Sequence, residues 1–277
     1  MLKQRTITAL VLALLGILLV LLSPTIMVAL ITGLAVVVAS LWEWTRLAGL
    51  AARPLRSAIV ALVAIALVPL WLLRDTPEVW WVIGAGVIWW LLAGWWLANV
   101  SFGAAPTREN AAVKLVAGLF ATLPAWLALI KLHEDPHRGP GWTLFALTLV
   151  SVADIAAYFT GSRYGRKKLC PQISPNKTVA GVYGALGATI LLAIVGGWIL
   201  GARGLAWLAF VALALVTVAF SIVGDLFESL IKRQAGVKDS GTLFPGHGGL
   251  FDRFDSVFAA LPVFAIGKAL LDLAFAP

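Results

Sequence analysis

The sequence predicts an all-α, polytopic integral membrane protein with about nine transmembrane helices and a cytoplasmic N-terminus. Hydrophobic residues make up 61% of the 277 positions and charged residues only 12%, whereas a soluble domain has about 25% charged residues. The mean hydropathy is +0.96. The polar residues also gather in short segments between apolar runs, as expected of a chain whose helices satisfy their own backbone groups inside a bilayer.

Nine apolar runs approach the length of about 20 residues that a membrane-spanning helix needs. Only Ser23 and Pro24 separate the first two runs, which predicts a tight hairpin. The first run lacks a convincing cleavage site for a signal peptide and is interpreted as a retained span. The nine expected spans are Ile7–Leu22, Thr25–Leu41, Ser57–Leu73, Val79–Val100, Ala112–Ile130, Trp142–Thr160, Val179–Leu200, Leu205–Val223 and Val257–Ala276.

The distribution of the 21 Lys and Arg residues predicts the orientation. Sixteen fall at the N-terminus and in alternate connections, Lys268 lies in the last span, and the opposite side has only Arg74, Lys131, Arg138 and Arg203. Basic residues concentrate on the cytoplasmic side, so the even-numbered connections are expected there. The net charge of +8 then reflects membrane topology, and a nucleic-acid-binding face is not expected.

An intramembrane carboxylate marks the first of two long polar segments, residues Ser151 to Gly181. Asp154 lies in an apolar helix, with Ser151 and Tyr158 about one turn away on the same face. A charge there costs about 2.5–3.5 kcal/mol on insertion scales, so it needs a partner, water or a cation. A helix-packing hydrogen bond is the structural alternative, and a functional role is favoured because a basic loop follows.

That loop contains the run from Ser174 to Thr178, directly before the seventh span. A lysine at a helix N-terminus is suited to binding phosphate, which favours Lys177 as a ligand. Alternatively, Ser174 or Asn176 caps the helix and Lys177 extends towards the membrane surface. The short run alone does not separate these two interpretations.

The second polar segment runs from Gly224 to Ser256. If the eighth span continues as a helix, Asp225, Glu228 or Ser229, and Lys232 form one polar stripe that emerges at the cytosolic interface. Mg²⁺ prefers oxygen ligands and usually binds one or two carboxylates together with substrate phosphates. Carboxylates at this helix end therefore indicate a magnesium site.

A glycine-rich run, residues 244–249, follows and leads to Asp252 and Asp255 near the start of the last span. Its glycines allow backbone amides to approach an anion closely. One of the two aspartates can serve as an N-cap, and the other then needs a different role. Carboxylates and cations on one side of a membrane favour phosphoryl or nucleotidyl transfer to a lipid phosphate.

The runs Ser229–Arg233, Lys238–Gly241 and Pro245–Asp255 together closely resemble the signature of the phosphatidate cytidylyltransferase (CDP-diacylglycerol synthase) family. Asp154 with Ala157–Phe159, and Ser174–Thr178, are similar to a second block of that family, although Asn176, Val179 and Ala180 depart from its commoner forms. The motifs fall in the last 125 or so residues. The location of the motifs divides the chain into two parts. Residues 1–140 are expected to form a scaffold of five helices, and residues 141–277 four helices with the catalytic loops.

The resemblance implies the reaction of CTP with phosphatidate to give CDP-diacylglycerol and pyrophosphate in a cytoplasmic (inner) membrane, with the active site facing the cytosol. It implies Mg²⁺, together with a second cation such as K⁺, held by Asp225 and Asp252, with Asp154 and Asp255 as further candidates. A homodimer is left open. The other expected site residues, which contact phosphates or shape the loop, are Ser174, Pro175, Lys177, Lys232, Arg233, Lys238, Gly246, His247, Gly248, Gly249 and Arg253.

Two rival functions have similar sequence features. A CTP-dependent polyprenol or lipid kinase would share the membrane site, but it would transfer the γ-phosphoryl group. A transporter would explain intramembrane Asp154, but it predicts two related halves with paired broken helices. No such repeat is visible, and the polar residues lie mostly at one membrane face.

Overall fold

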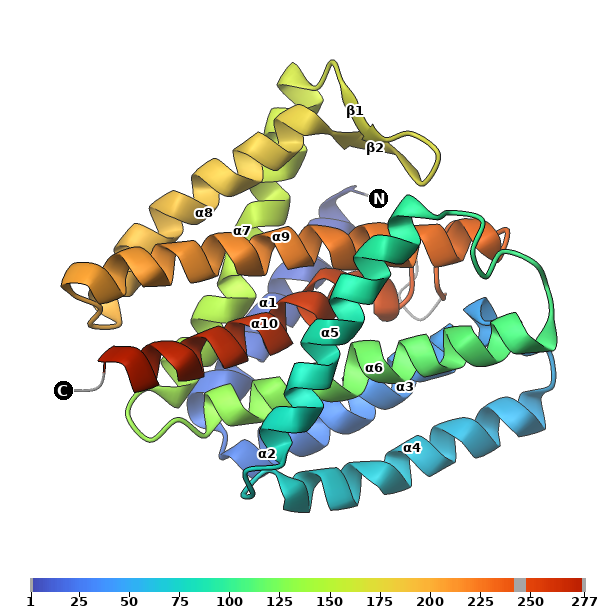
Figure 1. Ribbon diagram of the computed structural model, residues 1–277, viewed down its shortest axis with the longest axis horizontal. Coiled ribbons are helices and arrows are strands. Elements are labelled where there is room, and N and C mark those ends of the chain that lie inside the picture. The colour runs from blue at the N-terminus through green and yellow to red at the C-terminus, as the bar shows by residue number, and fades with distance from the viewer. Residues whose placement is uncertain (1, 242–247, 276–277) are drawn as a thin grey trace.

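The computed structural model describes residues 2–241 and 248–275 as a bundle of long helices with one short β-hairpin (Figure 1). Within these residues, eight helices are long and apolar enough to cross a membrane. They correspond to eight of the nine expected spans, which confirms an all-α, polytopic membrane protein. The membrane-spanning helices are Thr25–Leu47, Arg53–Leu73, Val79–Ala98, Arg108–His133, Gly139–Tyr164, Val179–Ile199, Gly204–Gln234 and Phe251–Phe275.

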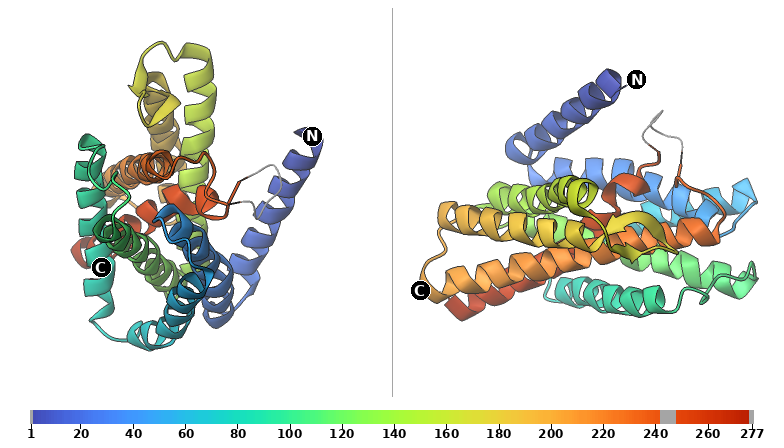
Figure 2. Two further views of the ribbon diagram at one scale, coloured as in Figure 1. Left: turned by 90° about the vertical axis from the view of Figure 1, so that its right-hand side faces the viewer. Right: turned by 90° about the horizontal axis from the view of Figure 1, so that it is seen from above.

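The first expected span is helix α1 (Leu2–Leu22), which contacts α7 (Gly139–Tyr164) and, through the Val20 carbonyl, lies 2.9 Å from His133 Nε2, while its N-terminal part projects from the bundle (Figure 2). Of the expected span Ile7–Leu22, the structure describes the side chains of Val11 and of the apolar stretch Ala13–Leu22, and the other side chains lie outside the described residues. The total of nine spans therefore stays a prediction.

The second span is longer than expected. It consists of α2 (Thr25–Ile31), a π-helical stretch η1 (Thr32–Val38) and α3 (Ala39–Leu47). The expected end at Leu41 is wrong because the helix continues to Leu47. Glu43 is consequently part of a membrane helix.

Helices from both parts of the chain are interleaved. In the second part, α9 (Gly204–Gln234) packs along α10 (Phe251–Phe275), and α7 packs along α8 (Val179–Ile199). From the first part, α5 (Val79–Ala98) and α6 (Arg108–His133) pack against α10, while α4 (Arg53–Leu73) lies at the edge (Figure 1). Residues 1–140 thus do not form a separate unit in space.

A cluster of buried aromatic rings holds the start of α10. Trp44 of α3 stacks on Phe251 with 4.6 Å between ring centroids, and on Phe227 of α9 at 6.1 Å. All three side chains are buried. Such pairs add about 0.5–1.5 kcal/mol beyond the burial of their area, so this cluster fixes three helices relative to one another.

The basic loop expected before α8 contains an antiparallel hairpin of β1 (Lys168–Cys170) and β2 (Ser174–Thr178). Thr178 is the N-cap of α8, and its Oγ1 accepts a hydrogen bond from the Gly181 amide at 3.1 Å. The capping role considered for Ser174 or Asn176 is therefore wrong. Both residues lie within β2, where their backbone is extended.

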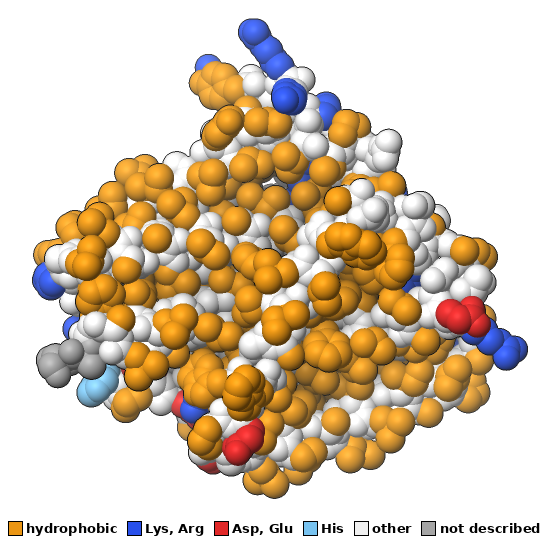
Figure 3. Space-filling view, in the orientation of Figure 1, with side chains coloured by type: hydrophobic (Ala, Val, Ile, Leu, Met, Phe, Trp, Pro, Cys, Tyr) orange, Lys and Arg blue, Asp and Glu red, His pale blue; other side chains and the backbone are white. Residues whose placement is uncertain are grey.

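The two polar segments lie toward the same end of the bundle. The hairpin, the end of α9 and the α3–α4 connection lie toward the right of Figure 1, whereas the α8–α9 turn and the C-terminal end lie on the left. Figure 3 shows a mainly apolar face with charged side chains gathered at its margins. This distribution is the one expected of a protein surrounded by lipid.

Candidate active site

The two polar segments meet at a cavity of about 800 Å³ between the hairpin and helices α7 to α10. This volume is within the range of ligand pockets, about 300–1,000 Å³. The charged residues that line it are five acidic and four basic side chains. They are Asp154, Asp225, Glu228, Asp252, Asp255, Lys168, Lys177, Lys232 and Arg253.

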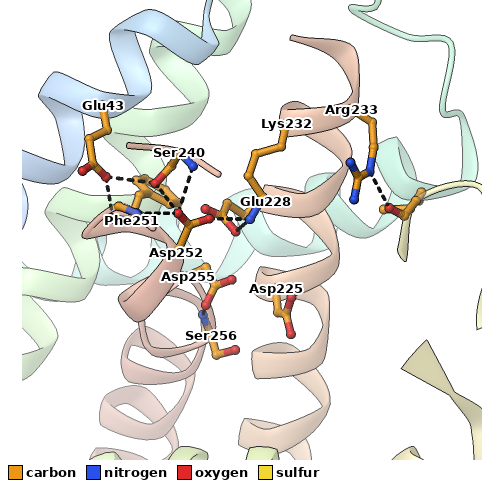
Figure 4. Close-up of polar contacts among 12 residues, drawn as sticks. Glu43, Asp225, Glu228, Lys232, Arg233, Ser240, Phe251, Asp252, Asp255 and Ser256 are labelled. Carbon is orange, nitrogen blue, oxygen red and sulfur yellow. Dashed lines mark hydrogen bonds and ion pairs between the residues drawn. The ribbon is translucent and has the colours of Figure 1, made fainter. Parts of the chain in front are cut away.

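Helix α9 presents the predicted polar stripe to this cavity. Asp225, Glu228 and Lys232 follow at helical spacing and all line it. Lys232 Nζ lies 2.6 Å from Glu228 Oε2 and 2.5 Å from Asp252 Oδ1 (Figure 4). Lys232 thus joins α9 to α10 by ion pairs to two carboxylates.

The hairpin supplies the second lysine of the cavity. Lys177 of β2 forms an ion pair with Asp225 of α9, which joins the first polar segment to the second. Burial lowers the pKa of Lys177 below its usual value, and the nearby carboxylates of Asp255, Asp154 and Glu228 oppose that effect. The site therefore places this ammonium group among acidic partners rather than toward the membrane surface.

Asp252 lies in the first turn of α10 and organises the connection before it. Its Oδ2 accepts hydrogen bonds from the Ser240 amide at 2.8 Å, the Gly249 amide at 2.7 Å and Ser240 Oγ at 2.9 Å. Asp252 thus engages the Gly249 amide, and the binding of substrate phosphate by that amide stays a prediction. Gly248 has a φ of +80°, a conformation that favours glycine.

Asp255 and Asp154 contribute carboxylates from two other positions. Asp255 is only 8% exposed, and its Oδ1 accepts a hydrogen bond from the Ser256 amide at 2.6 Å. Asp154 of α7 also lines the cavity. All four aspartates predicted as metal ligands thus border one cavity.

The donor set fits a cation that completes its coordination with substrate and water. Among the described residues, no group of three or more His, Cys, Asp or Glu side chains is arranged to hold a metal ion alone. Glu228 is 1% exposed, and its Oε1 has no hydrogen-bond partner in the described part of the chain. Since Mg²⁺ usually binds one or two carboxylates plus phosphates and water, this acidic cavity suits it.

Some predicted site residues lie away from the cavity lining. Arg233 donates a hydrogen bond from Nε to the Ile173 carbonyl at 3.3 Å and so ties the end of α9 to the hairpin (Figure 4). Lys238 is exposed in the α9–α10 connection, and Pro175 lies in β2. Ser174, Lys177 and Arg253 do line the cavity, whereas Gly246 and His247 lie outside the described residues.

Two buried glutamates, Glu228 and Glu43, were not among the site residues expected from the sequence. Glu228 belongs to the predicted stripe, and its place three residues after Asp225 was the available signal. Glu43 was missed because the second span was ended at Leu41, two residues before Glu43, whereas the helix continues to Leu47. The argument that singled out Asp154, a carboxylate in an apolar helix, applies equally to Glu43.

Comparison with known proteins gives the family. A model of the cytidylyltransferase family matches residues 3–271. The phosphatidate cytidylyltransferase of Pseudomonas aeruginosa is 42% identical over 269 residues, which cover 96% of each chain. That of Haemophilus influenzae is 33% identical over 96% of this chain and 98% of its own. With residues 3–271 matched and its polar segments joined at one cavity, this chain belongs to the cytidylyltransferase family.

Proposed function

We propose that this protein transfers the cytidylyl group of CTP to phosphatidate, giving CDP-diacylglycerol and pyrophosphate. The observation that carries the proposal is the cavity where Asp225 and Asp252 meet Lys177 and Lys232 at the end of a membrane-helix bundle. A lipid phosphate and a nucleotide triphosphate are both anionic, and this cavity offers cations next to carboxylates. The family match and the names of the two relatives support the same reaction.

In the proposed reaction a phosphate oxygen of phosphatidate attacks the α-phosphorus of CTP. A new bond forms between that oxygen and the α-phosphorus, and the bond from the α-phosphorus to the oxygen of the β-phosphate breaks. The electron pair leaves with pyrophosphate. A phosphate monoester has its second pKa near about 6, so the lipid is already a dianion and needs little help from a general base.

The residues of the cavity have to bring two anions together. Lys177, Lys232 and Arg253 line it and are suited to neutralise the phosphates and align the attack. Ser174 lines the same cavity and offers a hydroxyl to the nucleotide or the lipid phosphate. Both lysines pair with carboxylates in the structure, so their ammonium groups are already oriented toward the cavity when substrate arrives.

Asp225 and Asp252 are the proposed ligands of Mg²⁺, with Asp154, Glu228 and Asp255 at hand for a second cation such as K⁺. When bound, Mg²⁺ would neutralise phosphate charge and stabilise the departing pyrophosphate. The protein's own part is to hold carboxylates from two helices at one point. It does so through Lys177, Lys232 and the amides that bind Asp252.

The proposed location is the cytosolic face of a bacterial inner membrane, where CTP is available. The charge distribution along the sequence supports this orientation, and both relatives are bacterial. The two rival functions, a CTP-dependent lipid kinase and a transporter, gain no support from the family match.

The position of a radioactive label in CTP separates the proposed transfer from a kinase reaction. Purified protein is incubated with phosphatidate, Mg²⁺ and CTP labelled at either the α- or the γ-phosphate, and chloroform-extractable lipid is counted. Cytidylyl transfer moves only the α-label into lipid, and the γ-label appears in pyrophosphate. Label from the γ-position in lipid would instead identify a kinase, and no lipid label from an intact preparation would refute both.

A further inference from the structure

Glu43 is a buried carboxylate that reaches from α3 into the α9–α10 connection. Its side chain is 7% exposed. Oε1 accepts a hydrogen bond from the Leu250 amide at 3.0 Å, and Oε2 accepts from the Phe251 amide and from Ser240 Oγ, each at 2.9 Å (Figure 4). Helix α3, in the N-terminal part of the chain, therefore contacts the first half of the α9–α10 connection at Ser240 and its end at Leu250 and Phe251.

Two of these contacts satisfy the N-terminus of α10. The first amides of a helix have no partner inside it, and the helix dipole favours a negative charge there. Glu43 supplies that charge from a different helix, 208 positions away in sequence from Phe251. Because α10 begins at Phe251, this contact determines where the turn that bears Asp252 starts.

The connection has glycines where Glu43 approaches most closely. A Cβ at Gly241 would lie 2.2 Å from Glu43 Oε1, and one at Gly249 would lie 2.4 Å from Oε2. Neither distance is compatible with a real side chain. The backbone at Gly241 and the backbone at Gly249 therefore both pack directly against the Glu43 carboxylate.

Ser240 links Glu43 to Asp252. Its hydroxyl oxygen lies 2.9 Å from Glu43 Oε2 and 2.9 Å from Asp252 Oδ2, and its single hydrogen can be donated to only one of them at a time. A second side chain of α3 also reaches this point, because Arg46 Nη2 donates to the Ser240 carbonyl at 3.1 Å. Helix α3 therefore contacts Ser240 through two side chains, those of Glu43 and Arg46.

We infer that Glu43 is a positioning residue that holds Asp252 in place through Ser240 and the first amides of α10. Glu43 does not line the cavity, so it acts on the reaction only through these groups. The inference rests on the proposed function, in which Asp252 holds Mg²⁺. It assigns part of the site to residues 1–140, which the sequence had presented as scaffold alone.

Glu43→Gln tests the inference, because an amide oxygen replaces only one of two accepting oxygens. At least one donor of the connection would then face an NH₂ group. Ser240→Ala is expected to be milder, since Asp252 keeps the amides of Ser240 and Gly249 while Glu43 keeps those of Leu250 and Phe251. Glu43→Asp retains the carboxylate and should recover part of the lost function.

Ser40→Ala is the matched control. Ser40 is buried one turn earlier in α3, and its Oγ has no hydrogen-bond partner among the described residues. Loss of this hydroxyl changes the same helix but removes no hydrogen bond to the α9–α10 connection. The control should therefore keep the wild-type rate and the wild-type response to Mg²⁺.

Two readouts are measured on detergent-purified proteins: kcat and KM for CTP and phosphatidate, and the rise in melting temperature with Mg²⁺ in the absence of substrate. For Glu43→Gln we expect kcat to fall about 10- to 100-fold, the range for groups that orient a metal ligand. We also expect half-maximal thermal stabilisation to require several-fold more Mg²⁺, with intermediate values for Ser240→Ala and Glu43→Asp.

The inference is overturned if the folded Glu43 and Ser240 variants match Ser40→Ala in kcat and in the Mg²⁺ response. A lower melting temperature with unchanged kcat and Mg²⁺ response would likewise overturn it, because Glu43 would then be structural only. An inactive wild-type protein would refute the proposed function. The substrate-free Mg²⁺ measurement would still decide whether Glu43 orders the carboxylate of Asp252.

Discussion

Asp225 and Asp252 come from different helices, and each meets a lysine in the cavity. Lys177 pairs with Asp225, and Lys232 pairs with Asp252 and with Glu228. Burying carboxylates without partners is strongly unfavourable, so the lysines explain how this acidic site is tolerated among membrane helices. The same pairs place cations where two anionic substrates would meet.

At the residue scale, Asp225→Asn and Asp252→Asn should each lower kcat by about 100-fold or more. Groups that stabilise charge in a transition state contribute about this much each. The control is Asp272→Asn, at the far end of α10, where the side chain is 57% exposed and pairs with Lys268. Initial rates of lipid labelling with equal amounts of folded protein check the prediction, and a near-normal rate for either site variant would remove that aspartate from the ligand set.

At the element scale, the β-hairpin reaches the cavity because α8 begins at a fixed point. Thr178 ends β2 and caps α8 through Oγ1. A Cβ at Gly161 would lie 2.8 Å from the same Oγ1, so α7 packs closely against this cap. The position of Lys177, one residue earlier, follows from that contact.

Thr178→Ala is expected to destabilise the protein by about 1 kcal/mol, the usual effect of losing an N-cap hydroxyl. Thr178→Ser retains the hydroxyl and should stay close to the wild type. Melting temperatures of the detergent-purified proteins compare the two variants. Equal melting temperatures for alanine and serine would show that the cap contributes nothing.

A second element-scale contact joins the α6–α7 connection to the opposite end of α10. Lys268 is 8% exposed and pairs with Asp135 and with Asp272. Burial alone would raise the pKa of Asp135, but Lys268 and the amides of Arg138 and His137 hold that pKa below its usual value. The ionised carboxylate therefore stabilises the folded state.

The pH dependence of stability follows from this lowered pKa. The contribution of Asp135 is present above the unfolded pKa of about 3.9 and is lost as pH falls through the lower folded pKa. Asp135→Asn should thus lower the melting temperature at neutral pH, and its difference from the wild type should shrink below about pH 4. Asp75→Asn, whose side chain is 64% exposed beside Arg74, is the control, and a pH-independent difference for Asp135→Asn would contradict the prediction.

At the scale of the whole molecule, the sequence predicts the class of fold and eight of the spans because apolar length is a local property. The end of the second span was misplaced because Glu43 and Arg46 look like a polar boundary until their partners are known. Those partners, Ser240 and the start of α10, lie about 200 residues away. Single-sequence reasoning has no means of finding such contacts.

In the site too, features set by local sequence were predicted, whereas contacts between segments distant in sequence were not. Helical spacing placed Asp225 and Lys232 on one face of α9, and the motifs selected Asp252. Spacing did not show that Lys177 pairs with Asp225, or that Asp252 takes up the Gly249 amide. Both contacts depend on how the hairpin and the α9–α10 connection fold back onto α9 and α10.

Cytidylyl transfer at this cavity is tested most directly by measuring the products of the purified wild-type protein with CTP, phosphatidate and Mg²⁺. We predict CDP-diacylglycerol and pyrophosphate in equal amounts, and neither product when diacylglycerol replaces phosphatidate, because the attacking phosphate is then missing. Release of CDP without CDP-diacylglycerol, or unequal yields of the two products from an intact preparation, would contradict this assignment.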